Sequence, residues 1–339
     1  MDTLAQDLQK AQLELDTPGI LVGVRINEKE HYFSSGILRQ EDIHQTFYIY
    51  SITKTFTAIC LLKLIEEGLL SLETRLSDLL GEHSFLKETT IHHLLQHTSG
   101  LPEYSALEDY HTSVYKYPSQ PWSRVQILQK LSHKERIFPP GQGWSYSNTG
   151  YMLLHQIIEH ITGQTYAQVV KRKIIEPLGL FNTQVVIAPD REKKLLPGFD
   201  KQMASEDGDI RPLYHPDWVA TGLLSSNIPD LLKFYSVLFR GTGLQPDSLK
   251  LMKRSVRVPG DFPPFVSPSY GLGVMHDPDF PLGENIGHGG HGPGYTILLN
   301  NTFTQGGQDI VICILCNSTV QQPLFSLWNS VLQHFCNGE

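Results

Sequence analysis

A serine and a lysine three residues apart open a long apolar segment in this 339-residue chain. Ser51 and Lys54 follow the aromatic and β-branched run 47–50, which predicts a short buried strand. Apolar residues then recur at helical spacing up to Gly68, which predicts a buried helix that ends at this glycine. A serine on the first helical turn keeps a free backbone N–H, and the lysine lies one turn along the same face. The pair is typical of an activated hydroxyl nucleophile, although a helix N-cap serine would have the same sequence.

The Ser-x-x-Lys spacing occurs twice more, at Ser84/Lys87 and Ser113/Lys116. Both pairs have polar neighbours, and we expect solvated loops there. Only Ser51 precedes a long apolar helix, so it is the candidate nucleophile.

Tyr146-Ser147-Asn148 follows a loop rich in proline and glycine at 139–143. Such a loop can hold a phenol and an amide pointing into a cleft. The phenol could shuttle a proton if a neighbouring cation favours its anion, and the amide could bind both a lysine and a substrate. The alternative is that Asn148 only caps the helix predicted from Tyr151.

The glycine-rich stretch His288-Gly289-Gly290-His291 runs towards a predicted strand that begins at Tyr295. Glycines at this position would let a substrate approach the edge of a sheet closely, whereas the alternative is a flexible turn. No Gly-Lys-Ser/Thr ending follows, so it is not a phosphate loop, and no neighbouring carboxylate completes a metal site.

Two other groups of potential ligands are better explained without a metal. His93 and His97 are one helical turn apart, but no glutamate follows His93, so we expect surface or capping histidines. Cys313 and Cys316 lie in an apolar run that predicts a central strand, and no second cysteine pair accompanies them. The sequence therefore predicts no metal and no cofactor.

Composition narrows the possible partners. The net charge of −8 and the lack of a basic run argue against nucleic acid and anionic membranes as partners. The N-terminus has no cationic start or apolar core of a secretory signal, and no apolar run is long enough to span a bilayer. We expect a cytoplasmic protein that acts on a small molecule or peptide; leaderless export and the oligomeric state stay open.

The predicted elements place strands at both ends of the chain and helices between them. This order predicts an α/β fold in which one antiparallel sheet is built from both chain ends and flanked by helices. We expect an α/β lobe at about 1–71 and 251–339, with a mostly helical lobe inserted at about 72–250, within a single catalytic domain. The expected strands are 20–26, 31–35, 270–275, 295–299 and 310–316, and the main expected helices are 2–15, 91–97, 125–131, 151–161, 166–175, 230–239 and 324–335.

Taken together and in this order, the motifs that begin at Ser51, Tyr146 and His288 resemble those of the serine β-lactamase and penicillin-binding-protein superfamily. The resemblance is closest to the class C β-lactamase, D-aminopeptidase and esterase branch, and the stretches 90–102 and 176–180 support it. It covers nearly the whole chain and implies a beta-lactamase/transpeptidase-like fold.

The resemblance also implies roles for individual residues. Ser51 matches the nucleophile that becomes acylated, and Lys54 matches its general base. Tyr146 matches the group that relays protons with the lysine, and Asn148 the amide that holds the lysine and the substrate. The backbone N–H groups of Ser51 and His291 match the oxyanion hole, whose donors are each worth about 3–4 kcal/mol.

One departure limits the substrate. The family's Lys-Thr-Gly triplet appears here as His288-Gly289-Gly290, so a permanent cation is replaced by a ring that is mostly neutral near pH 7. This argues against penicillin-type substrates and leaves a serine hydrolase acting through an acyl-enzyme on an ester, amide, small peptide or lactam bond. The alternatives are a true β-lactamase or D-Ala carboxypeptidase, and a non-catalytic member that binds a ligand or self-assembles.

The aromatic residues Tyr104, Trp218 and Tyr295 are further candidates for the pocket wall. Their side chains would set the size of the substrate that fits.

Overall fold

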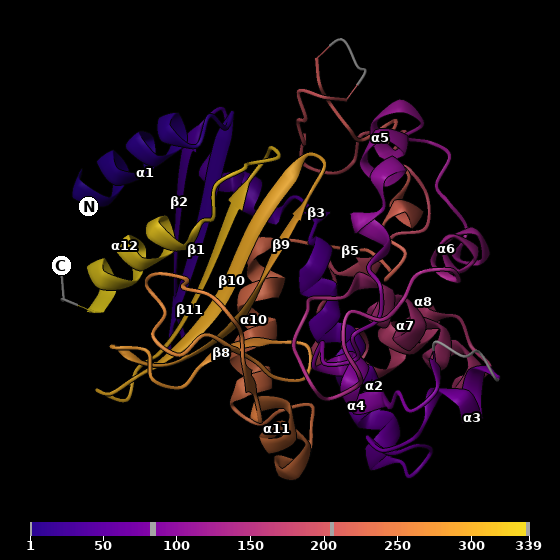
Figure 1. The fold of residues 1–339 in the computed structure, drawn as a ribbon. Coiled ribbons are helices and arrows are strands. Elements are labelled where there is room, and N and C mark those ends of the chain that lie inside the picture. The colour runs from indigo at the N-terminus through magenta and orange to yellow at the C-terminus, as the bar shows by residue number, and fades with distance from the viewer. Residues whose placement is uncertain (1, 82–85, 204–206, 337–339) are drawn as a thin grey trace.

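The computed structural model describes residues 2–81, 86–203 and 207–336, and an eight-stranded antiparallel sheet runs through its centre (Figure 1). Residues 20–26 of β1 pair with residues 310–316 of β11, so the two ends of the chain lie side by side in one sheet, as predicted. In order across the sheet the strands are β2 (Lys29–Gly36), β1 (Gly19–Ile26), β11 (Asp309–Cys316), β10 (Tyr295–Thr304), β9 (Gly283–Gly292), β8 (Met275–Asp277), β7 (Ser269–Tyr270) and β6 (Val256–Arg257).

Two terminal helices cover one face of the sheet. α1 (Asp2–Glu14) and α12 (Phe325–Cys336) lie together on this face, next to both chain ends (Figure 1). Trp328 is fully buried there, among apolar side chains of β1 and β11. All residues of β11 are buried because helices cover both of its faces, and Cys313 and Cys316 are free core thiols, as expected.

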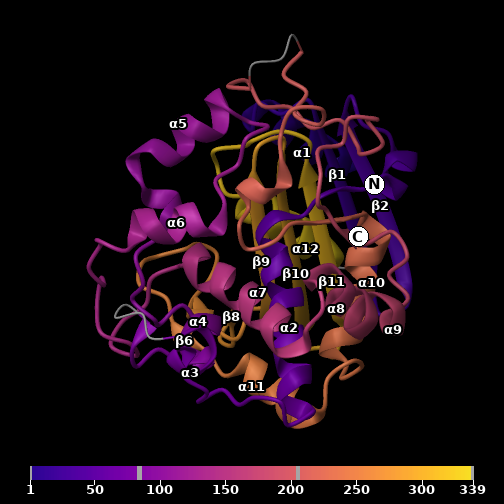
Figure 2. The same cartoon turned by 90° about the vertical axis from the view of Figure 1, so that its right-hand side faces the viewer.

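The opposite face packs against a larger group of helices (Figure 2). α10 (Ile228–Phe239) lies directly on β1, β10 and β11. α2 (Thr53–Glu66) packs beside it, through a stacked pair of rings, Phe56 and Phe234, whose centroids are 4.1 Å apart. α7 (Asn148–Thr162) and α8 (Tyr166–Val170) pack in turn against α2. The predicted helical lobe, about residues 72–250, includes α10. This helix, however, packs directly on the sheet of the predicted α/β lobe.

Shorter elements complete the chain. A second, three-stranded sheet joins distant segments in the order β3, β5 and β4. These elements are β3 (Phe47–Tyr48), β5 (Leu224–Ser226) and β4 (Gln184–Val185), the helices α3 (Leu76–Leu80), α4 (Ile91–Leu95), α5 (Glu108–Lys116), α6 (Arg124–Leu131), α9 (Glu176–Leu178) and α11 (Pro246–Lys253), the 3-10 turns Gln40–His44, Tyr50–Ile52, Tyr104–Ala106 and Pro216–Trp218, and the π-helical turn Lys171–Ile175.

Three predicted elements differ from the structure. The strand expected at 270–275 is the hairpin of β7 and β8, because Gly273 has a φ of 76° and turns the chain against α2. The glycine-rich stretch at 288–291 is not a loop but part of β9, fully paired with β10. Ser113 and Lys116 lie on α5 rather than in a loop, and Ser84 falls outside the described residues.

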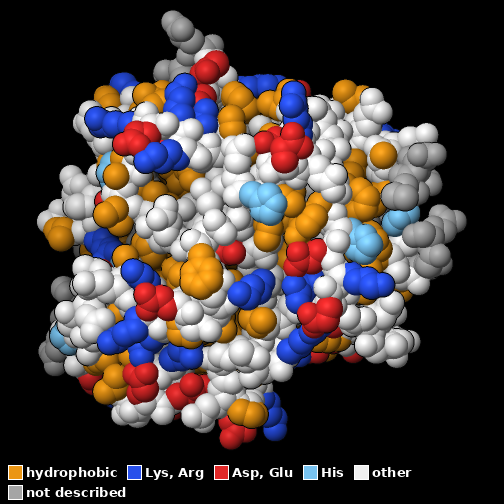
Figure 3. All heavy atoms as spheres, turned by 180° about the vertical axis from the view of Figure 1, so that it is seen from behind, with side chains coloured by type: hydrophobic (Ala, Val, Ile, Leu, Met, Phe, Trp, Pro, Cys, Tyr) orange, Lys and Arg blue, Asp and Glu red, His pale blue; other side chains and the backbone are white. Residues whose placement is uncertain are grey.

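The surface in the view from behind carries acidic and basic side chains interspersed, without a large patch of one sign (Figure 3). None of the helices in the described ranges combines the length and apolar character needed to cross a bilayer.

Candidate active site

The turn that carries Ser51 is held in a strained conformation. Ser51 lies in the 3-10 turn Tyr50–Ile52, directly before α2 rather than within its first turn. Tyr50 has a φ of 42°, a left-handed conformation that is uncommon for a residue other than glycine. The buried Tyr50 hydroxyl donates to the carbonyl of Pro293, at the end of the β9–β10 hairpin, which fixes the turn against the sheet.

Lys54 lies beside the candidate nucleophile and is almost fully buried, with 1% of its surface exposed. Its Nζ is 3.1 Å from Ser51 Oγ and 2.7 Å from Asn148 Oδ1. Burial lowers the pKa of Lys54 to about 7, and the charge of Glu103 opposes part of this shift. Near neutral pH a substantial fraction of the amine is therefore unprotonated and able to accept a proton.

Tyr146 completes this group from the other side. Its ring centroid is 4.8 Å from Lys54 Nζ, and its hydroxyl forms a hydrogen bond with Ser51. Burial raises the pKa of Tyr146 well above its ordinary value, and the Ser51 hydrogen bond offsets only part of this. The phenol therefore keeps its proton in the resting structure, and a role in proton transfer stays a prediction.

Asn148 is oriented by a carboxylate that the sequence did not single out. Its Nδ2 donates to Glu103 Oε1 at 3.2 Å, which directs its Oδ1 towards Lys54. Glu103 Oε2 also accepts a 3.1 Å hydrogen bond from the Thr149 N–H at the start of α7. The N-cap of α7 is Ser147, so the alternative in which Asn148 serves only as a cap is wrong. The only sequence signal for Glu103 was its position directly after the family-like stretch 90–102.

The glycines of β9 bring this strand against the Ser51 turn. A Cβ atom on Gly290 would lie 2.3 Å from the backbone oxygen of Ile49, and one on Gly292 would lie 2.3 Å from the ring of Tyr50. Gly289 has ordinary space, since its Cβ would meet nothing closer than 3.6 Å. At Gly290 and Gly292 a close approach to this strand is made by the turn that carries Ser51, and the approach of a substrate to the strand stays a prediction.

His288 is buried and has both ring nitrogens engaged. Its Nδ1 donates to the carbonyl of Gly289 at 2.6 Å, so its Nε2 accepts the hydrogen bond from the Tyr270 hydroxyl at 2.9 Å. Burial, assisted by the charge of Lys54, lowers the pKa of His288 to about 3. The ring is therefore neutral. His291, by contrast, is exposed, and its Nε2 donates to the carbonyl of Val320 at 3.0 Å.

The two histidines of the 93–97 pair have different positions. His93 caps its helix, with Nδ1 3.2 Å from the Thr90 N–H, as expected. His97 is not at the surface but completely buried, and its ring lies 4.3 Å from that of Tyr146. Its Nδ1 accepts from the Ser147 N–H at 3.0 Å, which ties the Tyr146 segment to the turn that follows α4. The sequence did not predict this role of His97, because two histidines one helical turn apart can equally be surface residues, helix caps or buried residues.

A cleft of about 410 Å³ opens at Ser51, Asn148 and His291. Among the predicted wall residues only Tyr104 lines it, because Trp218 and Tyr295 are buried in the core. Of the described residues that line the cleft, none is an aspartate, glutamate, lysine or arginine. The other lining residues are mainly aromatic or polar, and they include Tyr50, Ser105, Tyr110, His111, Tyr115, Gln202, Tyr214, Thr319 and Gln321.

Within the described ranges, no three histidine, cysteine, aspartate or glutamate side chains come close enough together to hold a metal ion. The arrangement around Ser51 thus consists of a hydroxyl, a buried amine, a phenol and an amide.

The sequence matches the family model described as Beta-lactamase over residues 2–333. This chain belongs to the beta-lactamase family. One relative, Penicillin-binding protein 4* of Bacillus subtilis (strain 168), is 29% identical to this chain over 266 residues. The match covers 75% of this chain and 57% of the relative. The putative penicillin-binding protein PbpX of the same strain is 26% identical over 289 residues, or 84% of this chain and 64% of that protein. The chain thus spans less than two thirds of either relative.

Solved structures extend the similarity to the whole fold. The D-stereospecific amidohydrolase from Streptomyces sp. is 27% identical, with a TM-score of 0.82 and 94% of each chain covered. The D-amino acid amidase from Ochrobactrum anthropi SV3 has the same fold, with a TM-score of 0.80, 22% identity and 99% of each chain covered. The family and the fold predicted from the three motifs are therefore confirmed.

Proposed function

We propose that this beta-lactamase family member is a serine hydrolase that is acylated on Ser51 and cleaves an amide, ester or small peptide bond. The observation that carries the proposal is the 3.1 Å separation of Lys54 Nζ and Ser51 Oγ, at an amine whose pKa is lowered to about 7. An amine with this pKa can take the serine proton at neutral pH, whereas an ordinary lysine cannot.

In the acylation step, Ser51 Oγ attacks the substrate carbonyl and its proton passes to Lys54 Nζ. The negative charge on the carbonyl oxygen is stabilised by the backbone N–H groups of Ser51 and His291. The C–N or C–O bond then breaks, and the leaving group takes a proton from the Tyr146 hydroxyl, which is replenished from the Lys54 ammonium. Asn148 keeps Lys54 in position and contacts the substrate carbonyl.

In the deacylation step, a water molecule attacks the Ser51 ester and gives a proton to the same amine and phenol pair. Collapse of the second tetrahedral intermediate returns a proton to Ser51 Oγ and releases the acid. Both steps use proton carriers that already lie within reach of Ser51 Oγ, so no metal or cofactor is required.

The electrostatics of the cleft favour substrates that are uncharged next to the scissile bond. None of the described lining residues is a lysine or arginine, and His288 is neutral with both nitrogens engaged. A carboxylate beside the scissile bond, as in β-lactams and D-Ala-D-Ala peptides, would therefore lose its hydration without gaining a cation. We propose uncharged amides and esters as the substrate class.

The names of two relatives support amide and peptide bonds as the target. The Streptomyces protein is a D-stereospecific amidohydrolase by title. AmpH of Escherichia coli (strain K12), a D-alanyl-D-alanine-carboxypeptidase/endopeptidase, is 29% identical over 44% of this chain and 39% of its own length. The configuration of the acyl group is left to experiment.

The acyl-enzyme is tested by labelling with a fluorophosphonate followed by intact mass measurement. We expect one adduct on the wild-type protein and none on Ser51→Ala. No adduct on the folded wild type would support the non-catalytic alternative, and an equal adduct on Ser51→Ala would mean that the nucleophile is another residue.

The substrate class is tested with a panel of nitrophenyl esters, D- and L-amino acid nitroanilides and a chromogenic cephalosporin. We expect kcat/KM for the best neutral substrate to exceed that for the cephalosporin by about 10²-fold or more, since an unpaired buried charge costs several kcal/mol. A faster cephalosporin reaction would favour a true β-lactamase.

A further inference from the structure

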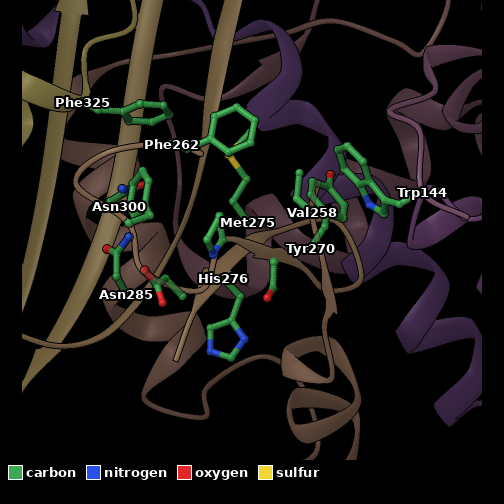
Figure 4. A pocket seen from close by; sticks show the side chains of 13 residues that line it. Trp144, Val258, Phe262, Tyr270, Met275, His276, Asn285, Asn300 and Phe325 are labelled. Atoms are coloured by element: carbon green, nitrogen blue, oxygen red, sulfur yellow. The ribbon is translucent and has the colours of Figure 1, made fainter. Parts of the chain in front are cut away.

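A second cavity, of about 170 Å³, lies outside the candidate active site (Figure 4). Its walls are aromatic and aliphatic over most of their area, and Phe262, which is 41% exposed, stands at the rim. A dry cavity of about 150 Å³ lined by apolar side chains can bind benzene. The space therefore suits one small ring. The apolar lining residues are Trp144, Val258, Phe262, Phe265, Pro268, Tyr270, Met275 and Phe325.

One end of this cavity is polar. Asn285 and Asn300 lie together on the side opposite Trp144 (Figure 4), and each is only 3% exposed. Asn285 Oδ1 accepts from the Thr302 hydroxyl at 3.2 Å, whereas no described residue hydrogen-bonds to Asn285 Nδ2 or to the Asn300 amide. These amide atoms are accessible from the cavity, so a ligand with a matching polar atom can hydrogen-bond to them there.

The cavity is distinct from the catalytic cleft, because the two have no lining residue in common. They are separated by a layer of rings. Tyr270 lines the cavity, while its hydroxyl contacts His288 and its ring centroid lies 4.5 Å from that of His97. Trp144 likewise lines the cavity and packs against His97, with 6.0 Å between the ring centroids.

We propose that this cavity binds a small aromatic molecule that carries one hydrogen-bonding group, with a substituted phenol as the simplest example. The ring packs among Phe262, Phe265, Met275 and Trp144, and the hydroxyl reaches the amides of the polar end. The volume limits the ligand to a single ring. The buried side chain of Asp277 also lines the cavity, and together with the neutral amides it favours an uncharged hydrogen-bond donor over an anion.

The probe is 4-fluorophenol, titrated into the full chain and observed by fluorine NMR. We expect saturable binding to the wild type, and binding at least about tenfold weaker to Val258→Trp, whose indole fills the cavity. Val266→Trp is the matched control, since Val266 is 52% exposed and does not line the cavity; its affinity should stay within about twofold of wild type. No saturable binding to the wild type, or equal binding to Val258→Trp, would overturn the site.

Two further measurements locate the ligand and its polar contact. Gln321→Trp crowds the catalytic cleft and should leave the affinity unchanged; loss of binding there would place the phenol in the cleft and overturn the proposal. Fluorobenzene should bind about tenfold more weakly than 4-fluorophenol, because it cannot use the amides. Equal affinities would overturn the role of the polar end. If Val258→Trp does not fold, Met275→Trp reduces the cavity from another wall and should weaken binding in the same way.

Discussion

The chemistry at Ser51 depends on how Lys54 is buried. Its amine sits among Ser51, Asn148 and the rings of Tyr146 and Tyr151, and no carboxylate of the described residues forms an ion pair with it. Removing the ammonium from water without a paired anion destabilises its charged form, which is why its pKa falls to about 7. A side chain that is ordinarily charged thus carries an amine that can accept a proton at neutral pH.

We expect Lys54→Met and Tyr146→Phe each to lower kcat by about 10²–10⁴-fold, because each removes a group that moves a proton in the reaction. Steady-state kinetics on the best ester substrate provide the measurement, and circular dichroism shows whether each variant is folded. Near-wild-type kcat in a folded variant would mean that the role of that residue is wrongly assigned.

The pH dependence of kcat/KM should report the titration of Lys54. The base acts in its neutral form, so the rate should rise with pH and level off above a midpoint of about pH 7. The charge of Glu103 raises the pKa of Lys54, so Glu103→Gln should move this midpoint to lower pH. A purely structural role for Glu103 would change the rate without moving the midpoint, and an unmoved midpoint would contradict the assignment.

At the scale of elements, the site depends on the contact between β9 and the turn Tyr50–Ile52. This contact is possible because β9 has no side chain at Gly290 and Gly292, where a Cβ would overlap Ile49 and Tyr50. The strand and the turn are more than 200 residues apart in the chain, yet the pair holds Ser51 and His291 at one cleft.

We expect Gly290→Ala to lower the free energy of unfolding by about 1–3 kcal/mol and to reduce kcat, because its methyl group forces the strand away from Ile49. Gly289→Ala is the matched control on the same strand, where the nearest atom is 3.6 Å from the added Cβ. Urea unfolding and ester hydrolysis measure both effects. Equal behaviour of the two variants would show that this close approach is not required.

At the scale of the whole molecule, the sheet separates two apolar cores. One lies between the sheet and α1 and α12, around Trp328, and the other lies between the sheet and the remaining helices. The candidate active site belongs to the second side. The first core reaches the site through Val320, whose carbonyl accepts the hydrogen bond from His291 Nε2, and its other contribution is to stability.

We expect Trp328→Ala to lower the free energy of unfolding by about 3–5 kcal/mol, since the side chain is fully buried and leaves a large cavity. kcat of the protein that stays folded should be unchanged. Phe181→Ala, at a ring that is 84% exposed, should change stability by less than about 0.5 kcal/mol. Urea unfolding gives the stabilities, and a large loss of kcat in folded Trp328→Ala would mean that the two cores are coupled.

The sequence alone determined the features that are local in the chain. Apolar residues at helical spacing predicted α2, α10 and α12, because such a periodicity buries one stripe of a helix wherever that helix packs. Alternating and continuous apolar runs likewise predicted β1 and β11. The order and spacing of the motifs at Ser51, Tyr146 and His288 indicated the family. The division into two lobes stays a prediction.

Only the tertiary structure decided which residues meet and in what chemical state. Lys54 and Asn148 are 94 residues apart in the chain, yet their side chains are hydrogen-bonded. Glu103, from a third segment, orients the Asn148 amide. Sequence spacing carries no information on such contacts, because they depend on how separate helices and strands pack. The lowered pKa values of Lys54 and His288 follow from burial, which exists only once the chain has folded around them.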